Sequence, residues 1–128
     1  MKRIIEYKDL LTVIDKLLRD RESSEIEYKS ATGGFPGSFW ETYSSFANTH
    51  GGTIILGVKE RGDHFFLDGL TEEQTKKYQR DFFNNMHSKK NVNVALLKED
   101  DVQTVKLGRD YFMFFYIPQV DRSRRPVF

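Results

Sequence analysis

Residues 52–58, GTIILGV, constrain the fold more than any other segment of the sequence. Apolar, mostly β-branched residues occupy both the odd and the even positions of this run, which point to opposite faces of a strand. This pattern is typical of a strand that is covered on both faces. The corner ANTHG, residues 47–51, comes directly before it. A helix that ends and feeds at once into a buried strand needs a positive φ, which glycine adopts at little cost. The sequence therefore predicts a helix, a tight turn at Gly51 and Gly52, and a central strand.

The segments before this corner also follow recognisable patterns. Apolar residues recur at helical spacing in residues 7–19, which predicts an amphipathic helix. Residues 25–30, EIEYKS, alternate as a half-buried strand does, with the carboxylates on the side away from the core. Residues 31–38 are rich in Gly and Pro and predict a loop. Ser38 and Glu41 have the spacing of a capping box for a helix that ends near Asn48.

The second half of the chain predicts one further helix and several strands. Thr71 and Gln74 have the spacing of a capping box, and the helix behind them should run to about His87. Turns are expected at Gly62 and at Asp68, and strands are expected at residues 64–67, 92–96, 102–107 and 111–118. The whole pattern predicts an α+β fold, a mixed β-sheet packed with about three helices.

Composition limits the classes of protein that remain. The 128 residues are enough for one domain with a single core. With 20 Lys plus Arg against 19 Asp plus Glu, the net charge is only +1, so affinity for nucleic acid must come from local patches. The absence of cysteine excludes disulfides and thiolate metal sites. No apolar run approaches the roughly 18 residues of a membrane span, so we expect a cytoplasmic protein with no membrane partner.

Acidic residues before and after the predicted strands could hold a metal ion. Glu22 and Glu27 lie in ESSEIEYK, and Glu60 follows the central strand. If the strand of Glu27 pairs beside the central strand, these three carboxylates could converge at one end of the sheet and bind Mg²⁺ or Mn²⁺. Such a metal could activate water against a phosphodiester. The alternative is that exposed glutamates are simply solvated.

Basic and polar residues give a second set of candidates, for contact with nucleic acid. Asn48 and Thr49 are polar groups at a helix end where no packing demands them. The candidate phosphate contacts are Lys29, Lys59, Arg61, Lys89, Lys90, Arg122, Arg124 and Arg125. Scattered surface cations are the alternative in a chain with this much charge. His50 and His64 are interpreted as ordinary surface or turn residues, and the sequence has no phosphate-binding loop or dinucleotide fingerprint.

Four motifs in a fixed order carry a resemblance to a known family. ESSEIEYK, FANTHGG, TIILGVKERG and LDGL occur in this order, over nearly the whole chain from Glu22 onward. Together they resemble the Schlafen AlbA-like domain, which is described as a DNA-binding domain of bacterial transcriptional regulators. The resemblance implies an α+β fold related to AlbA and a nucleic-acid-binding module joined to further domains, such as an ATPase-like or winged-helix region.

The resemblance also implies a candidate catalytic set. Vertebrate Schlafen nucleases cut transfer and ribosomal RNA with three carboxylates, of which the first two match Glu22 and Glu27. Their third acid, an aspartate, falls on Glu60, which here is a glutamate between Lys59 and Arg61. Those enzymes build their RNA groove from two lobes, whereas this chain has one; formation of a homodimer could restore such a groove.

Three functional hypotheses follow. The first is a DNA- or RNA-binding module of a transcriptional regulator. The second is a metal-dependent endoribonuclease in which Glu22, Glu27 and Glu60 hold the ion and Lys29 steadies the phosphate. The third is a protein-interaction or dimerisation domain, which the low net charge favours. In each case residues 1–128 are expected to form one domain, the N-terminal part of a longer protein.

Overall fold

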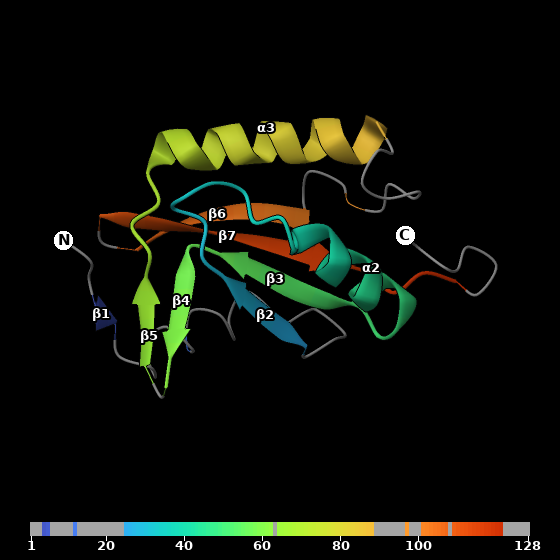
Figure 1. Cartoon of the computed structure of the whole chain (residues 1–128), viewed down its shortest axis with the longest axis horizontal. Coiled ribbons are helices and arrows are strands. Elements are labelled where there is room, and N and C mark those ends of the chain that lie inside the picture. Colours follow the sequence, from blue (N-terminus) through green and yellow to red (C-terminus); the bar gives the residue numbers. More distant parts are fainter. Residues whose placement is uncertain are drawn as a thin grey trace.

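A computed structural model describes residues 4–5, 12, 25–62, 64–88, 97, 101–107 and 109–121. Its two named helices and seven strands confirm an α+β fold (Figure 1). The elements are β1 (Ile4–Ile5), β2 (Ile26–Lys29), α2 (Phe39–Asn48), β3 (Gly52–Leu56), β4 (Val58–Arg61), β5 (His64–Leu67), α3 (Glu72–Ser88), β6 (Val102–Leu107) and β7 (Asp110–Ile117). Thr12 is helical, but the rest of the helix predicted at residues 7–19 and the strand predicted at residues 92–96 lie outside the described residues.

The larger sheet is the predicted mixed sheet. Its strand order is β2-β3-β7-β6, with β2 parallel to β3 and the other pairs antiparallel. Every residue of β3 is buried, which confirms the prediction of a central strand covered on both faces. The parallel pair is connected through α2, as parallel strands require a crossover. Figure 1 shows α3 lying above β6 and β7.

A second, three-stranded sheet was not predicted. It has the order β1-β5-β4, with both pairs antiparallel. The apolar run of residues 52–58 does not form one strand, because Gly57 adopts a φ of +95° and the chain passes there from β3 into β4. A Cβ at Gly57 would lie 2.7 Å from Leu70 and 3.0 Å from the carbonyl oxygen of Tyr111. Glycine is therefore required where the chain leaves one sheet for the other.

An aromatic core joins the two helices to the larger sheet. Phe39 of α2, Phe82 of α3 and Phe115 of β7 are buried, and their ring centroids lie 4.9–5.5 Å apart. Trp40 stacks on Phe82 at 5.3 Å with its ring almost parallel. Edge-to-face and stacked pairs of this kind add to the stability gained by burial. The core therefore fixes α2 and α3 on the same face of the sheet.

The corner between α2 and β3 confirms the role predicted for Gly51. The carbonyl oxygen of Phe46 accepts hydrogen bonds from the backbone N–H groups of Thr49 and Gly51, at 3.2 and 2.7 Å. Gly51 has a φ of +76°, as the turn requires. Gly52 serves a different purpose, since a Cβ there would lie 2.5 Å from the ring of Phe46. The first glycine turns the chain, and the second makes room for an aromatic side chain.

One of the two predicted capping boxes is present. Thr71 N–H donates to Gln74 Oε1 at 3.0 Å, and Gln74 N–H donates to Thr71 Oγ1 at 3.1 Å, so the box that precedes α3 is confirmed. The box predicted for Ser38 and Glu41 is wrong, because Ser38 has helical backbone angles and its side chain makes no cap hydrogen bond. The Ser38 hydroxyl instead accepts a hydrogen bond from Lys29 Nζ at 2.9 Å.

Candidate functional site

The glycine-rich loop of residues 30–38 is held at its base by Asp68. Asp68 follows β5 and is only 3% exposed. Its Oδ2 accepts hydrogen bonds from the Ser30 hydroxyl and from the backbone N–H of Ala31, the latter at 3.2 Å. A buried carboxylate is costly unless it accepts hydrogen bonds. The two bonds therefore fix the beginning of the loop against the second sheet.

Helix α3 holds the same part of the loop from the other side. The Tyr78 hydroxyl donates to the carbonyl oxygen of Ala31 at 2.6 Å, and Gln74 Nε2 donates to the carbonyl oxygen of Thr32 at 3.3 Å. Burial raises the pKa of the Tyr78 phenol above its usual value of 10.0. Tyr78 is therefore a neutral hydrogen-bond donor to the loop at ordinary pH.

Beyond this base the loop is open to solvent, apart from Phe35 and Pro36, which are half-buried. Gly33, Gly34 and Gly37 are exposed, and a Cβ at any of them would meet no atom within 4 Å. Phe35 is half-buried, and its ring centroid lies 4.8 Å from that of Phe39 and 5.9 Å from that of Tyr78. Phe35 thus joins the loop to the aromatic core while part of its ring stays accessible.

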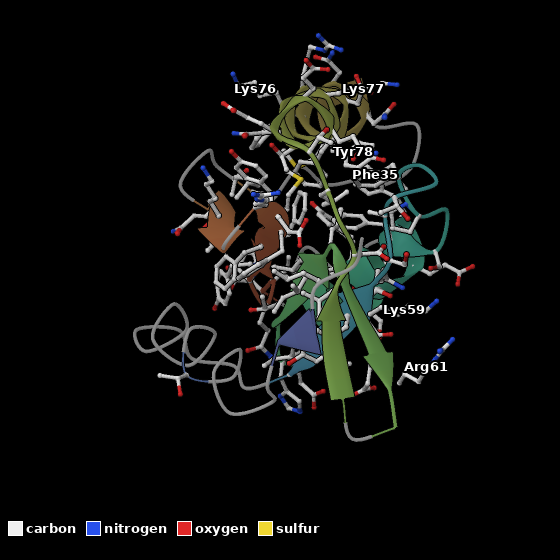
Figure 2. All side chains as sticks on the ribbon, turned by 90° about the vertical axis from the view of Figure 1, so that its left-hand side faces the viewer. Phe35, Lys59, Arg61, Lys76, Lys77 and Tyr78 are labelled. Atoms are coloured by element: carbon white, nitrogen blue, oxygen red, sulfur yellow. The ribbon has the colours of Figure 1, made fainter. Side chains whose placement is uncertain are left out.

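Two of the predicted cations lie on the same side of the molecule as Phe35. In β4, Lys59 is half-buried and Arg61 is exposed. Because they are two residues apart in a strand, they lie on the same face of it. In Figure 2 both project from one side of the molecule, with Phe35 above them and Lys77 of α3 above Phe35, whereas Lys76 lies on the other side of α3. We call the side that carries Phe35, Lys59, Arg61 and Lys77 the loop face.

Lys29 and Glu27 lie at the edge of the larger sheet. Their register partners on β3 are Leu56 and Ile54, which belong to the hydrophobic core under the helices. The prediction that the carboxylates of this strand point away from the core is therefore wrong for Glu27. Both faces of the sheet are covered, so the alternation of apolar and charged residues along β2 could not identify which face packs under the helices. Glu27 stays exposed because β2 is an edge strand.

The predicted metal ligands are only partly placed by the structure. Glu60 is exposed on β4 and Glu27 is exposed on β2, and these two strands contact each other although they belong to different sheets. Glu22 lies outside the described residues. Among the residues that the structure describes, no three His, Asp or Glu side chains lie together as a metal site would require. The three-carboxylate site therefore stays a prediction.

Asn48 and Thr49 lie at the opposite end of the larger sheet from Lys59 and Arg61. They end α2 just before β3 begins, and the carbonyl oxygen of the residue before them, Ala47, accepts a hydrogen bond from Val120 N–H at 3.0 Å. The Thr49 hydroxyl donates to the carbonyl oxygen of Ser45 at 2.8 Å, as a residue that ends a helix often does. The structure thus places these two polar residues just before β3 begins, whereas the cations of β4 follow the end of β3.

The remaining predicted contacts, Lys89, Lys90, Arg122, Arg124 and Arg125, lie outside the described residues. Sequence reasoning also missed four residues of the loop face or its supports: Phe35, Asp68, Lys77 and Tyr78. An acidic residue directly after an apolar strand was the available signal for Asp68, but its partners Ser30 and Ala31 are distant in the sequence. No described helix is both long and apolar enough to cross a membrane.

The fold and the site define a class of protein: an α+β domain in which a parallel strand–helix–strand unit carries a glycine-rich loop. The chain belongs to the Schlafen AlbA_2 family, whose profile matches residues 22–126. It is also similar to the solution NMR structure of the N-terminal domain of an ATP-dependent DNA helicase RecG-related protein from Nitrosomonas europaea. The two chains are 32% identical with a TM-score of 0.64, and the match covers 97% of this chain and 80% of that chain. No curated protein matches this sequence.

Proposed function

We propose that this domain binds nucleic acid through the loop face. The family supports this proposal, and so does the similarity to the N-terminal domain of a RecG-related protein. The observation that carries it is the grouping of Lys59, Arg61 and Lys77 on the side of the molecule where Phe35 is partly exposed (Figure 2). Cations that neutralise phosphates supply most of the affinity for a nucleic-acid backbone. An aromatic ring among them can stack on an unpaired base.

Salt-dependent binding tests this proposal. Labelled transfer RNA and duplex DNA should bind at low salt. The K59A/R61A variant should bind about tenfold to a hundredfold more weakly at about 0.1 M salt, because two cations no longer neutralise phosphates. The K76A/R80A variant is the matched control. It removes the same charge from exposed residues of α3, and Lys76 lies on the other side of that helix (Figure 2). Equal losses in both variants would contradict a specific role for the loop face.

A metal-dependent endoribonuclease is the second candidate. One observation favours it: Glu27 and Lys29 share a face of β2, and β2 contacts β4, which carries Glu60. Carboxylate oxygens suit Mg²⁺ or Mn²⁺, so Glu27 and Glu60, together with Glu22, would hold the ion. The ion would supply an activated water. Lys29 would hold a phosphate oxygen and, for this, its ammonium group would leave the Ser38 hydroxyl or bridge both groups.

Cleavage of labelled transfer RNA with and without Mn²⁺ tests the second candidate. Cutting should require the metal and should disappear in E27Q, which removes one charge with little change in shape. E41Q, an exposed glutamate of α2, is the control and should cut normally. Cutting that persists in excess chelator or in E27Q would exclude this mechanism.

The role of the domain within a larger protein is also a proposal. We infer that residues 1–128 act as one module of a longer chain, in keeping with a similar structure that is itself an N-terminal domain. A transcriptional regulator is one such chain. A homodimer would bring two loop faces into one particle, and sedimentation analysis with and without transfer RNA would detect it. A domain that binds no nucleic acid at low salt would instead favour a protein-interaction role.

A further inference from the structure

Three strand ends from both sheets meet in a continuous set of hydrogen bonds. Where β2 ends, the carbonyl oxygen of Lys29 accepts from the N–H of Gly57 at 3.0 Å. The carbonyl oxygen of Gly57, between β3 and β4, accepts from the N–H of Asp68 at 2.7 Å. The side chain of Asp68, just after β5, accepts from Ser30 and Ala31 and so leads back to the end of β2. We call these bonds the strand junction.

Asp68 is the member of the strand junction that contributes both backbone and side chain. It is 3% exposed, so its carboxylate has exchanged water for the hydroxyl of Ser30 and the N–H of Ala31. Hydrogen bonds to a charged acceptor are stronger and shorter than neutral ones. The side chain is therefore a stiff link between the beginning of the loop and the strand that pairs with β4.

Two parts of the loop face begin at this junction. The loop that carries Phe35 and Ser38 leaves it on one side, and β4 with Lys59 and Arg61 leaves it on the other. Tyr78 and Gln74 hold the loop to α3, whereas Asp68 holds it to the second sheet. A change at Asp68 would therefore move the loop relative to β4 while the core under α2 and α3 stayed intact.

We infer that Asp68 is a positioning residue of the loop face: it sets the distance and orientation between the loop and the cations of β4, and so determines how many phosphates one nucleic acid can contact at once. The inference rests on the function proposed above. It adds a residue that touches no nucleic acid itself, and it predicts an effect on the salt dependence of binding in addition to the effect on stability.

The test combines D68N, which keeps the size of the side chain and removes its charge, with S30A, which removes one donor at an exposed residue. D121N makes the same chemical change at an exposed position outside the junction and is the control. Each variant is titrated with labelled transfer RNA and with labelled duplex DNA at several salt concentrations. Amide hydrogen exchange of Ala31 and Gly57 is measured in the same variants without RNA.

We expect D68N and S30A to speed the amide hydrogen exchange of Ala31. In a plot of the logarithm of the binding constant against the logarithm of the salt concentration, the size of the slope should fall by about one, which corresponds to one phosphate fewer on the loop face. Their affinity at about 0.1 M salt should fall about tenfold for each phosphate that the loop face no longer neutralises. D121N should match the wild type.

The outcomes separate this inference from the proposed function. If both variants change stability but keep the wild-type affinity and slope, the inference is overturned while the proposed function stands. If the wild type binds neither transfer RNA nor duplex DNA, the proposed function fails, and unchanged exchange in D68N would then overturn the junction as well. Should D68N fail to fold, S30A alone decides the inference.

Discussion

Replacing Gly52 by alanine should destabilise the domain because the new methyl group would overlap the ring of Phe46. A Cβ at this position would lie 2.5, 2.6 and 2.7 Å from three ring carbons of Phe46, whereas carbon atoms in ordinary contact stay about 3.5–4.0 Å apart. The ring must therefore shift by about 1 Å. Overpacking of this size costs about 1–3 kcal/mol, so we expect G52A to lower the free energy of unfolding by about 2 kcal/mol.

A double-mutant cycle separates this clash from other effects of the substitution. Phe46 is 9% exposed, and its truncation in F46A should cost about 3–4 kcal/mol. With the ring gone, alanine at position 52 has room, so G52A should cost nothing further in the F46A background. The two substitutions should then be coupled by about 2 kcal/mol. Gly52 does not have a positive φ, so backbone strain adds no cost in either background.

Urea denaturation of the four proteins in this cycle measures the coupling. The slope of unfolding free energy against urea should stay constant, so that midpoints report stability. G37A is the control, since a Cβ at this exposed glycine meets no atom within 4 Å and should leave the midpoint unchanged. Additive costs for G52A and F46A would refute the steric argument, because the penalty at position 52 would then have nothing to do with the ring.

Other features of the structure give further predictions. T71A should lose about 1 kcal/mol because it removes the confirmed cap of α3, whereas S38A should change stability by less than about 0.5 kcal/mol; urea midpoints would show whether the two really differ. The raised pKa of Tyr78 means that the unfolded chain loses its phenolic proton first as pH rises. The stability that Tyr78 contributes should thus be complete below its ordinary pKa of 10.0 and decline above it. The difference in midpoint between the wild type and Y78F, measured across that range, should shrink, and a constant difference would argue against a neutral buried phenol.

Local pattern was sufficient for most elements of this fold. The buried strand β3 was predictable because apolar, mostly β-branched residues occupy both its odd and its even positions. The turn before it was predictable because Gly51 follows a helix. The capping box of Thr71 was equally local, since both partners lie within one helical turn. In each case the signal that predicts the element lies within a short stretch of the sequence.

The errors arose where distant residues decide the outcome. Ser38 matched a cap pattern, but Lys29 from the neighbouring strand binds its hydroxyl. The run of residues 52–58 looked like one strand, but the space beside Leu70 and Tyr111 requires glycine at position 57 and divides the run between two sheets. The candidate site was the hardest part to predict, because only the three-dimensional fold places Phe35, Lys59 and Lys77 on the same side of the molecule (Figure 2).

The pairing of β3 has a consequence for the synthesis of this protein. One edge of β3 pairs with β2, which precedes it closely, whereas the other edge pairs with β7, with Gly52 opposite Ile117. A ribosome makes the chain from its N-terminus, so one edge of the apolar strand β3 stays unpaired until β7 has emerged. Unpaired apolar edges favour aggregation, and long-range pairing slows folding. Nascent chains that stop before β7 should consequently depend on chaperones, and those that extend past it should not.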